Sequence, residues 1–340
     1  MKKICLVIIV IFNFMSNTSA QNPDFLFMVE QAIKAPSGHN TQPWLFKIND
    51  SSIEIRPNLD RSLPIVDFDN RELFISLGCA TENLCIAASH KGYETEISVG
   101  EEGIITVALN KLPDMNPDPL FEQIVVRQTN RSVYNGNIVP ADTIEVLKII
   151  PIEPGIKFHI YKSGTPEFDS IATYIYRGNT LQMQNKAFKE ELRNWMRYNK
   201  KHQNETNDGL SYAVFGAPNL PKWIIKPIMS RAVNEDSQNK GDRKKLKSAS
   251  HLVLFTTQKN SIEEWVNIGR TLERFLLKST EMEIAHSYFN QPNELRELSE
   301  QMAESLNIPE EHPTILIRLG YGDIMPYAKR KGISTVIVNE

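Results

Sequence analysis

The chain has 340 residues, of which 41% are hydrophobic and 23% are charged, and its formal net charge is −3 at pH 7. This length allows a sizeable core and about two domains. The composition is that of an ordinary globular protein, and the slightly negative charge gives no reason to expect a nucleic-acid partner.

The first 20 residues have the pattern of a secretory signal peptide. Lys2 and Lys3 form a basic start, an apolar run extends from Ile4 to Met15, and Thr18 and Ala20 stand at the small-residue positions of a cleavage site. The apolar run is shorter than the roughly 20 residues that span a bilayer. We therefore expect cleavage of this leader, no stable membrane insertion afterwards, and a periplasmic or secreted location.

A loop of special residues follows the first predicted helix. The segment APSGHNTQPW, which ends at Trp44, lies between an apolar stretch with helical spacing and a stretch with strand-like alternation. Gly38 frees the backbone, and the side chains of Ser37, Asn40 and Gln42 carry hydroxyl and amide groups that donate and accept hydrogen bonds. Such neutral groups suit a flat heteroaromatic ligand better than proton transfer. A turn that only caps a strand, with the tryptophan in the core, is the alternative.

An apolar stripe predicts a long second helix, which ends at a glycine. We interpret Asp67 and Asp69, which precede this helix, as caps and not as catalysts. Cys79 and Cys85 lie on different sides of the helix, so no disulfide between them is expected. Two strands and a proline-rich connection at 113–119 follow, and we place the boundary between two halves of the chain within that connection.

Basic residues at two distant places predict an anion site. Arg127 and Arg131 flank Thr129, and two planar guanidinium groups with a hydroxyl between them suit a phosphate. Taken alone, two arginines at this spacing are far more typical of an exposed charged helix end. The run that contains Lys329 and Arg330 would by itself be a solvated tail, but together with the two earlier arginines it becomes a candidate second side of the anion site.

The remaining elements of the second half are predicted from periodicity. We expect helices at 167–197, 224–233, 261–280 and 295–306, strands at 157–161, 251–257 and 314–319, and irregular segments at 199–207, 235–247 and 281–291. The charged segment at 235–247 is either an anion patch or a solvated loop, and the solvated loop is the simpler interpretation.

Three of these motifs, in this order, resemble those of the FMN-dependent nitroreductases, and most closely the branch in which one chain carries two nitroreductase-like halves. The loop is similar to the APS-x-x-N-x-QPW segment of that family, RQTNR to its R-x-S/T-x-K/R motif, and KRK to its basic tail. The resemblance implies an α+β fold with sheets flanked by long helices. The halves, 21–118 and 119–340, would form a pseudo-dimer, and an insertion at about 199–250 would cover the active site.

The resemblance also implies roles for individual residues. The residues expected to bind FMN are Ser37, Gly38, Asn40, Gln42, Arg127, Thr129, Arg131, Lys329 and Arg330. Arg127, Thr129 and Arg330 would contact the phosphate, and Arg131 would lie near the N1/O2 edge of the flavin, where a cation stabilises the reduced form. Which backbone group would reach flavin N5 is not indicated.

The implied activity is that of an oxidoreductase with a small-molecule substrate. NAD(P)H would give a hydride to flavin N5, and a nitroaromatic, a quinone or a similar acceptor would then receive the electrons. The cofactor would carry the chemistry, so neither a side-chain nucleophile nor a metal site is expected. The alternatives are a flavin-sequestering protein without turnover, favoured by the predicted export to where NAD(P)H is normally absent, and a degenerate fold that has lost flavin. We expect a monomer or a weak homodimer.

Overall fold

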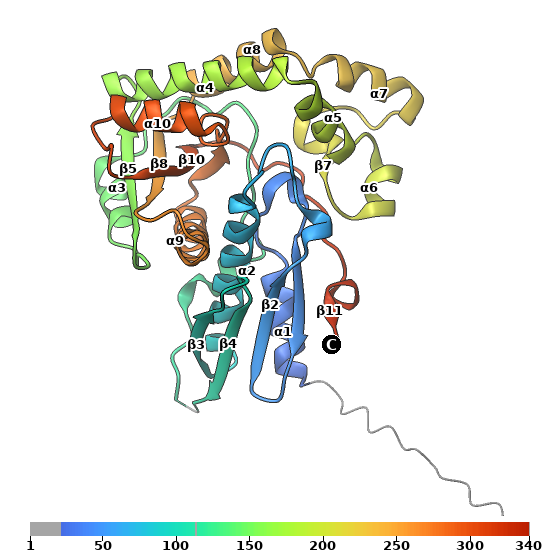
Figure 1. The fold of residues 1–340 in the computed structure, drawn as a ribbon, viewed down its shortest axis with the longest axis vertical. Coiled ribbons are helices and arrows are strands. Elements are labelled where there is room, and N and C mark those ends of the chain that lie inside the picture. The colour runs from blue at the N-terminus through green and yellow to red at the C-terminus, as the bar shows by residue number, and fades with distance from the viewer. Residues whose placement is uncertain (1–21, 113, 340) are drawn as a thin grey trace, which may run out of the picture.

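The computed structural model describes residues 22–112 and 114–339, so the predicted signal peptide lies outside the described residues. Two main sheets are connected by long helices (Figure 1). The first sheet has the strand order β11-β1-β2-β4-β3, the second has the order β5-β8-β10-β9, and β6 pairs with β7 in a small third sheet. The predicted class, α+β with sheets flanked by long helices, is confirmed for this part of the chain.

The described strands are β1 (Trp44–Ile48), β2 (Ser52–Pro57), β3 (Tyr93–Val99), β4 (Ile105–Lys111), β5 (Ile156–Lys162), β6 (Met196–Arg197), β7 (Leu210–Ser211), β8 (His251–Thr257), β9 (Ala285–Tyr288), β10 (His312–Gly320) and β11 (Ile337–Val338). The described α-helices are α1 (Pro23–Ala32), α2 (Arg71–His90), α3 (Ala141–Lys148), α4 (Pro166–Gln184), α5 (Lys186–Trp195), α6 (Lys200–Thr206), α7 (Lys222–Arg231), α8 (Glu235–Lys247), α9 (Ile262–Glu281) and α10 (Arg296–Ser305).

The second sheet is covered on both faces, which explains why β8 is buried along its whole length. Val253 and Phe255 point to the core that contains α9, whereas Leu252 and Leu254 point to the core that contains α4 and α10. Successive side chains of a strand point to opposite faces, so a strand between two helical layers has no polar face. Figure 1 shows this sheet between α9 and the pair α4 and α10.

The helices α2 and α9, each 20 residues long, cross at two glycines. A Cβ atom at Gly78 would lie 2.1 Å from the carbonyl oxygen of Val266, and one at Gly269 would lie 2.2 Å from that of Ile75. The backbones therefore touch at the crossing, and any side chain at either glycine would push the helices apart. This contact joins the two sheets, because α2 comes from the first half of the chain and α9 from the second.

Several segments differ from the predictions. The segments 199–207 and 235–247 were expected to be irregular but contain α6 and α8, whose N-termini are capped by Asn199 and Asn234. Helix α8 has very few apolar residues, so its periodic signal is weak; Leu246 provides its buried contact. The segment 281–291 was also expected to be irregular, yet it contains β9, which pairs with β10.

The C-terminal segment crosses from the second half of the chain to the first. Strand β11 pairs in parallel with β1, with Phe46 opposite Ile337. The predicted second half, residues 119–340, therefore contributes one strand to the sheet of the first half. Within the described ranges, none of the helices combines the length and the hydropathy that crossing a bilayer requires.

Candidate functional site

A cavity of about 910 Å³ lies where segments from both halves meet. Its walls come from the loop around Gly38, the start of α2, the segment around Arg131, the insertion at 199–250, the segment around Asn290 and the C-terminal segment around Arg330. The volume is in the range of small-molecule and cofactor sites. Sequence positions nearly 300 residues apart thus converge on one space.

The loop at 36–42 has an unusual backbone. His39, Asn40 and Gln42 all have positive φ angles, of 48°, 56° and 54°. Non-glycine residues seldom adopt this conformation, and a run of them persists only where the surroundings hold it. The hydroxyl of Ser37 accepts a hydrogen bond of 3.0 Å from the backbone N–H of Gln42 and closes the turn.

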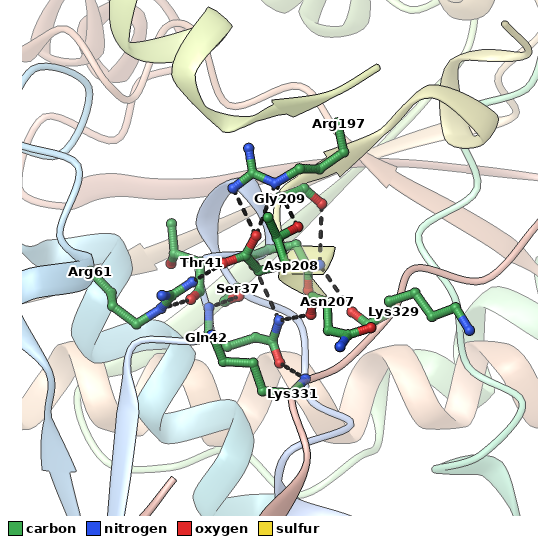
Figure 2. A network of polar contacts seen from close by, with 12 residues as sticks. Ser37, Thr41, Gln42, Arg61, Arg197, Asn207, Asp208, Gly209, Lys329 and Lys331 are labelled. Carbon is green, nitrogen blue, oxygen red and sulfur yellow. Dashed lines mark hydrogen bonds and ion pairs between the residues drawn. The ribbon is translucent and has the colours of Figure 1, made fainter. Parts of the chain in front are cut away.

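The two amide side chains of this loop bind other segments of the protein. Asn40 donates from Nδ2 to the carbonyl oxygens of Gly209, at 3.2 Å, and Lys329, at 3.1 Å. Gln42 donates to the carbonyl oxygen of Asn207, at 2.9 Å, and accepts from the backbone N–H of Lys331, at 2.8 Å. The loop therefore fastens both the insertion and the C-terminal segment over the cavity (Figure 2).

Ion pairs also connect the insertion to the region around the loop. Arg61 lies 2.5 Å from Asp208, and Arg197 lies 2.7 Å from the same carboxylate. Arg61 also donates to the carbonyl oxygen of Thr41, beside the loop. Burial opposes ionisation of Asp208, but the hydrogen bonds from both arginines hold its pKa below the usual value. Asp208 thus links the loop region to the interior of the insertion (Figure 2).

Two of the predicted cations are already engaged by the protein. Arg127 is only 5% exposed, and its Nε lies 3.4 Å from Oε1 of the buried Glu273. Arg127 and Arg330 both donate to the carbonyl oxygen of Lys34, at 2.5 and 3.2 Å. Burial and the neighbouring Arg127 lower the pKa of Arg330 to about 9. Both guanidinium groups line the cavity, and Glu273 balances one of the two charges.

Arg131 is different, because within the described residues its guanidinium has no hydrogen bond and no ion pair, although it lines the cavity. Burial lowers its pKa, but an arginine remains charged at neutral pH. Burial and the charge of Arg131 hold the pKa of His39 at about 4, so this imidazole is neutral. The cavity therefore carries a positive charge that the described protein does not neutralise.

An acidic group lines the same cavity. Burial and the neighbouring Glu294 raise the pKa of Glu72 to about 8, and burial raises that of Glu294 to about 7. Asn290 donates to Glu72, and Gln182 donates to Glu294. Asp67, whose pKa burial raises to about 7, accepts from the first N–H groups of α2 and thereby acts as its cap. At neutral pH this group holds at least one proton.

The structure brings together most of the predicted site residues. The cavity is lined by Ser37, Gly38, Asn40, Arg127, Thr129, Arg131 and Arg330. Gln42 does not line it, because its side chain is completely buried against the insertion and the C-terminal segment. The side chain of Lys329 is exposed and also lies outside the lining, although its backbone carbonyl accepts from Asn40.

Some lining residues could not be predicted. Glu72 has the sequence signature of a first-turn helix residue, and nothing local shows that Glu294 will pack beside it. Asn290, which follows β9, also lines the cavity. Cys79 also lines it; its thiol donates to the carbonyl oxygen of Gly269 and forms no disulfide, as predicted.

Comparisons with known proteins agree with this picture. The chain is 22% identical over 320 residues to two curated proteins from Mycobacterium tuberculosis, strains CDC 1551 / Oshkosh and ATCC 25618 / H37Rv, each provisionally named an NAD(P)H nitroreductase. The alignments cover 90% of this chain and 88% of each relative. The chain is nitroreductase-like. No family model matches it.

Solved nitroreductase structures are also similar to this nitroreductase-like chain. The FMN-dependent nitroreductase NfnB from Mycobacterium smegmatis, in complex with NADPH, is 13% identical, with a TM-score of 0.40 over 63% of this chain and 94% of that one. A nitroreductase with bound FMN from Bacteroides fragilis NCTC 9343 is 16% identical, with a TM-score of 0.38 over 66% of this chain and 100% of that one. The division into two fused halves and the individual site residues stay predictions.

Proposed function

We propose that this chain is an FMN-dependent oxidoreductase of the nitroreductase type, which takes electrons from NAD(P)H and passes them to a nitroaromatic, a quinone or a similar small acceptor. The observation that carries the proposal is the unpaired guanidinium of Arg131 in a cavity of about 910 Å³. The names of the two mycobacterial relatives support the choice of NAD(P)H as electron donor.

The cavity fits FMN in charge and in surface. An arginine cannot lose its charge at neutral pH, so Arg131 in a partly buried cavity favours an anionic ligand, and the phosphate of FMN is one. Ile75, Ile124, Leu272 and Ile315 provide apolar surface for a flat ring. Ser37 adds a hydroxyl group to the same wall, and Gly38, which has no side chain, adds its backbone.

Bound FMN would supply two-electron redox chemistry. The protein would bind the flavin, exclude water from the cavity and hold a proton on a side chain that lines it. Arg131 and Arg330 stabilise negative charge on a ligand, and the insertion covers the cavity with Leu210, Val214 and Met229. Glu72, paired with Glu294, holds a proton on a carboxyl oxygen that lines the cavity at neutral pH.

Titration of FMN into the purified chain, followed by anaerobic addition of NADPH, tests the proposal. We expect saturable binding with one flavin per chain, followed by bleaching of the flavin absorbance and its return when a quinone is added. Arg131→Ala is the matched variant, and it should bind FMN more weakly. Absence of FMN binding by the native chain would refute the proposal.

A flavin-binding protein that sequesters its ligand without turnover is the second candidate. The observation that favours it is the double fastening of the insertion, by Asn40 and Gln42 on one side and by Asp208 on the other. A closed insertion would keep NAD(P)H from the flavin. If this candidate is correct, dithionite will bleach the bound flavin but NADPH will not.

We also infer that one chain forms a pseudo-dimer with one flavin between its halves. The crossing of two 20-residue helices, one from each half, at Gly78 and Gly269 supports this arrangement, as does a cavity with walls from both halves. Light scattering should show a monomer or a weakly associating dimer. Two flavins per chain would contradict this inference.

Export of the chain is a further part of the proposal. The basic, apolar and small residues of the leader support a mature protein that begins near Gln21 and lies in the periplasm or outside the cell. N-terminal sequencing of protein from the cell envelope tests this. An intact leader on protein from the cytosol would overturn it.

A further inference from the structure

Helix α7 has two apolar sides. Its inner side is buried and lines the cavity through Ile225 and Met229. Its outer side carries Trp223, which is 78% exposed, and the exposed Pro227, whereas Ile228, which is 56% exposed, lies between the two sides and also lines the cavity. In Figure 1 the helix lies at the margin of the molecule. A tryptophan so exposed is unusual on a surface that meets only water.

Cations also lie beside α7, on the side that faces α5. A hollow of about 660 Å³ between α5 and α7 is bordered by Lys186, Lys189, Arg193, Lys222 and Lys226. Within the described residues no ion pair engages any of these five side chains. Glu190 is the one carboxylate in the lining. Burial, Lys222 and Arg197 lower the pKa of His202, which also borders the hollow.

The charge of this region is opposite to that of the whole protein. Between residues 186 and 231 the sequence contains nine Lys and Arg but four Asp and Glu, whereas the whole chain has a net charge of −3. One of the four acids, Asp208, pairs with Arg61 and Arg197, and Glu191 accepts hydrogen bonds from the backbone of Ile65 and Val66. The positive charge is therefore concentrated around α5 and α7.

We propose that α7, together with the basic hollow beside it, docks the protein on an anionic lipid bilayer. Tryptophan favours the interface between water and hydrocarbon, and lysines can bury their stems while their ammonium groups reach lipid phosphates. An amphipathic helix with an apolar face and basic flanks lies in the plane of such a surface.

Other polyanions fit this surface less well. A nucleic acid or an acidic protein would neutralise the lysines but would leave Trp223 and Ile228 in water. A neutral bilayer would cover the apolar side chains but would leave the cations of the hollow without counter-ions. An anionic bilayer satisfies both groups of residues. Since Ile225, Ile228 and Met229 also line the cavity, docking places one wall of the cavity at the bilayer surface. The inference rests on surface residues and is independent of the proposed redox function.

Binding to lipid vesicles measures the docking. The full chain is mixed with vesicles of phosphatidylcholine alone or of phosphatidylcholine with phosphatidylglycerol, and the bound fraction is measured by sedimentation. Vesicles of phosphatidylcholine alone give the background, including any binding by the apolar leader. We expect stronger binding to the anionic vesicles and a loss of that excess at high salt. Lys222→Gln with Lys226→Gln should weaken the anionic component on the order of 20-fold.

A matched control separates local charge from total charge. Lys162→Gln with Lys259→Gln removes the same charge from exposed residues next to β5 and β8, far from α7 in Figure 1. This variant should bind like the parent. If both double variants lose binding equally, the attraction depends on net charge and the proposal is wrong.

Tryptophan fluorescence reports on α7 directly. Trp44 and Trp265 are buried and Trp195 is partly buried, so acrylamide quenching in solution comes largely from the exposed Trp223. Anionic vesicles should protect the parent from quenching, whereas Trp223→Ala should show little further protection. Unchanged quenching of the parent at saturating vesicle concentration would overturn the proposal. Binding to heparin with no binding to vesicles would also overturn it and would indicate a general polyanion site.

Discussion

The cations and the acids that line the cavity reach electrical balance in different ways. Burial and the neighbouring Glu294 raise the pKa of Glu72 to about 8, and burial raises that of Glu294 to about 7, so protonation relieves this group at neutral pH. Arginines do not have this option, because the guanidinium stays protonated in proteins. Arg127 is balanced by Glu273, whereas Arg131 has no counter-charge within the described residues.

This difference between the lining groups indicates which positive charge is available to a ligand. Arg127 and Arg131 are four residues apart in the sequence and have the same chemistry, yet one is engaged in a buried ion pair and the other is not. A phosphate that enters the cavity compensates Arg131 without breaking an existing pair. The phosphate-binding role of Arg127 stays a prediction, and Arg131 is the lining arginine whose charge no described carboxylate balances.

The largest effect is expected from Arg127→Ala. This variant leaves Glu273 buried without its partner, and the loss of one member of a buried pair costs about 3–5 kcal/mol in the free energy of unfolding. Urea denaturation measures this cost. Arg127→Ala combined with Glu273→Gln should recover part of the loss. A destabilisation below about 1 kcal/mol would show that the pair contributes little.

Arg131→Ala should act on the ligand and not on the fold. Loss of a hydrogen bond to a charged group costs about 1.5–3 kcal/mol, and we expect a loss of that size in FMN affinity. The free energy of unfolding without ligand should change little, because no hydrogen bond or ion pair within the described residues is removed. Arg131→Lys, which keeps the charge but not the planar fork, should retain part of the affinity. Equal FMN affinity in parent and Arg131→Ala would rule out the assignment.

The acidic group predicts a pH dependence of stability. Glu72 and Glu294 bind protons more tightly in the folded state than in the unfolded state, where the ordinary value is 4.5. Their contribution is fully present below that value and is lost as the pH rises through about 7 and about 8. Glu294→Gln removes the repulsion. Relative to this variant, the parent should lose about 1–2 kcal/mol in the free energy of unfolding towards alkaline pH. Parallel pH profiles for the two proteins would contradict this explanation.

The smallest effect is expected from Lys329→Ala. The lysine side chain is exposed, and only its backbone carbonyl contacts the loop. Both the free energy of unfolding and the FMN affinity should change by less than about 0.5 kcal/mol. Arg330→Ala is the adjacent comparison, because it removes hydrogen bonds to Asn40 and Ala35 and should weaken both properties. A larger effect of Lys329→Ala than of Arg330→Ala would show that Lys329, and not Arg330, is the more important residue of the basic tail.

Local sequence determined the elements whose signal lies within one segment. The apolar stripes of α2 and α9, the buried run of β8 and the cap formed by Asp67 depend on residues a few positions apart, and a periodic pattern records such contacts directly. The convergence of the loop, the Arg127–Arg131 motif and the basic tail was expected only because these motifs resemble those of a known family. The cavity confirms their proximity.

Tertiary structure alone decided which of these residues line the cavity. Gln42 and Asn40 have the same amide chemistry, but Gln42 is enclosed by backbone groups of the insertion and the C-terminal segment, whereas Asn40 remains at the cavity wall. The repulsion between Glu72 and Glu294 spans 222 positions, and the pairing of β11 with β1 spans about 290. Such contacts leave no local pattern, because the partner that determines the pKa, the burial or the pairing of a residue comes from a distant segment.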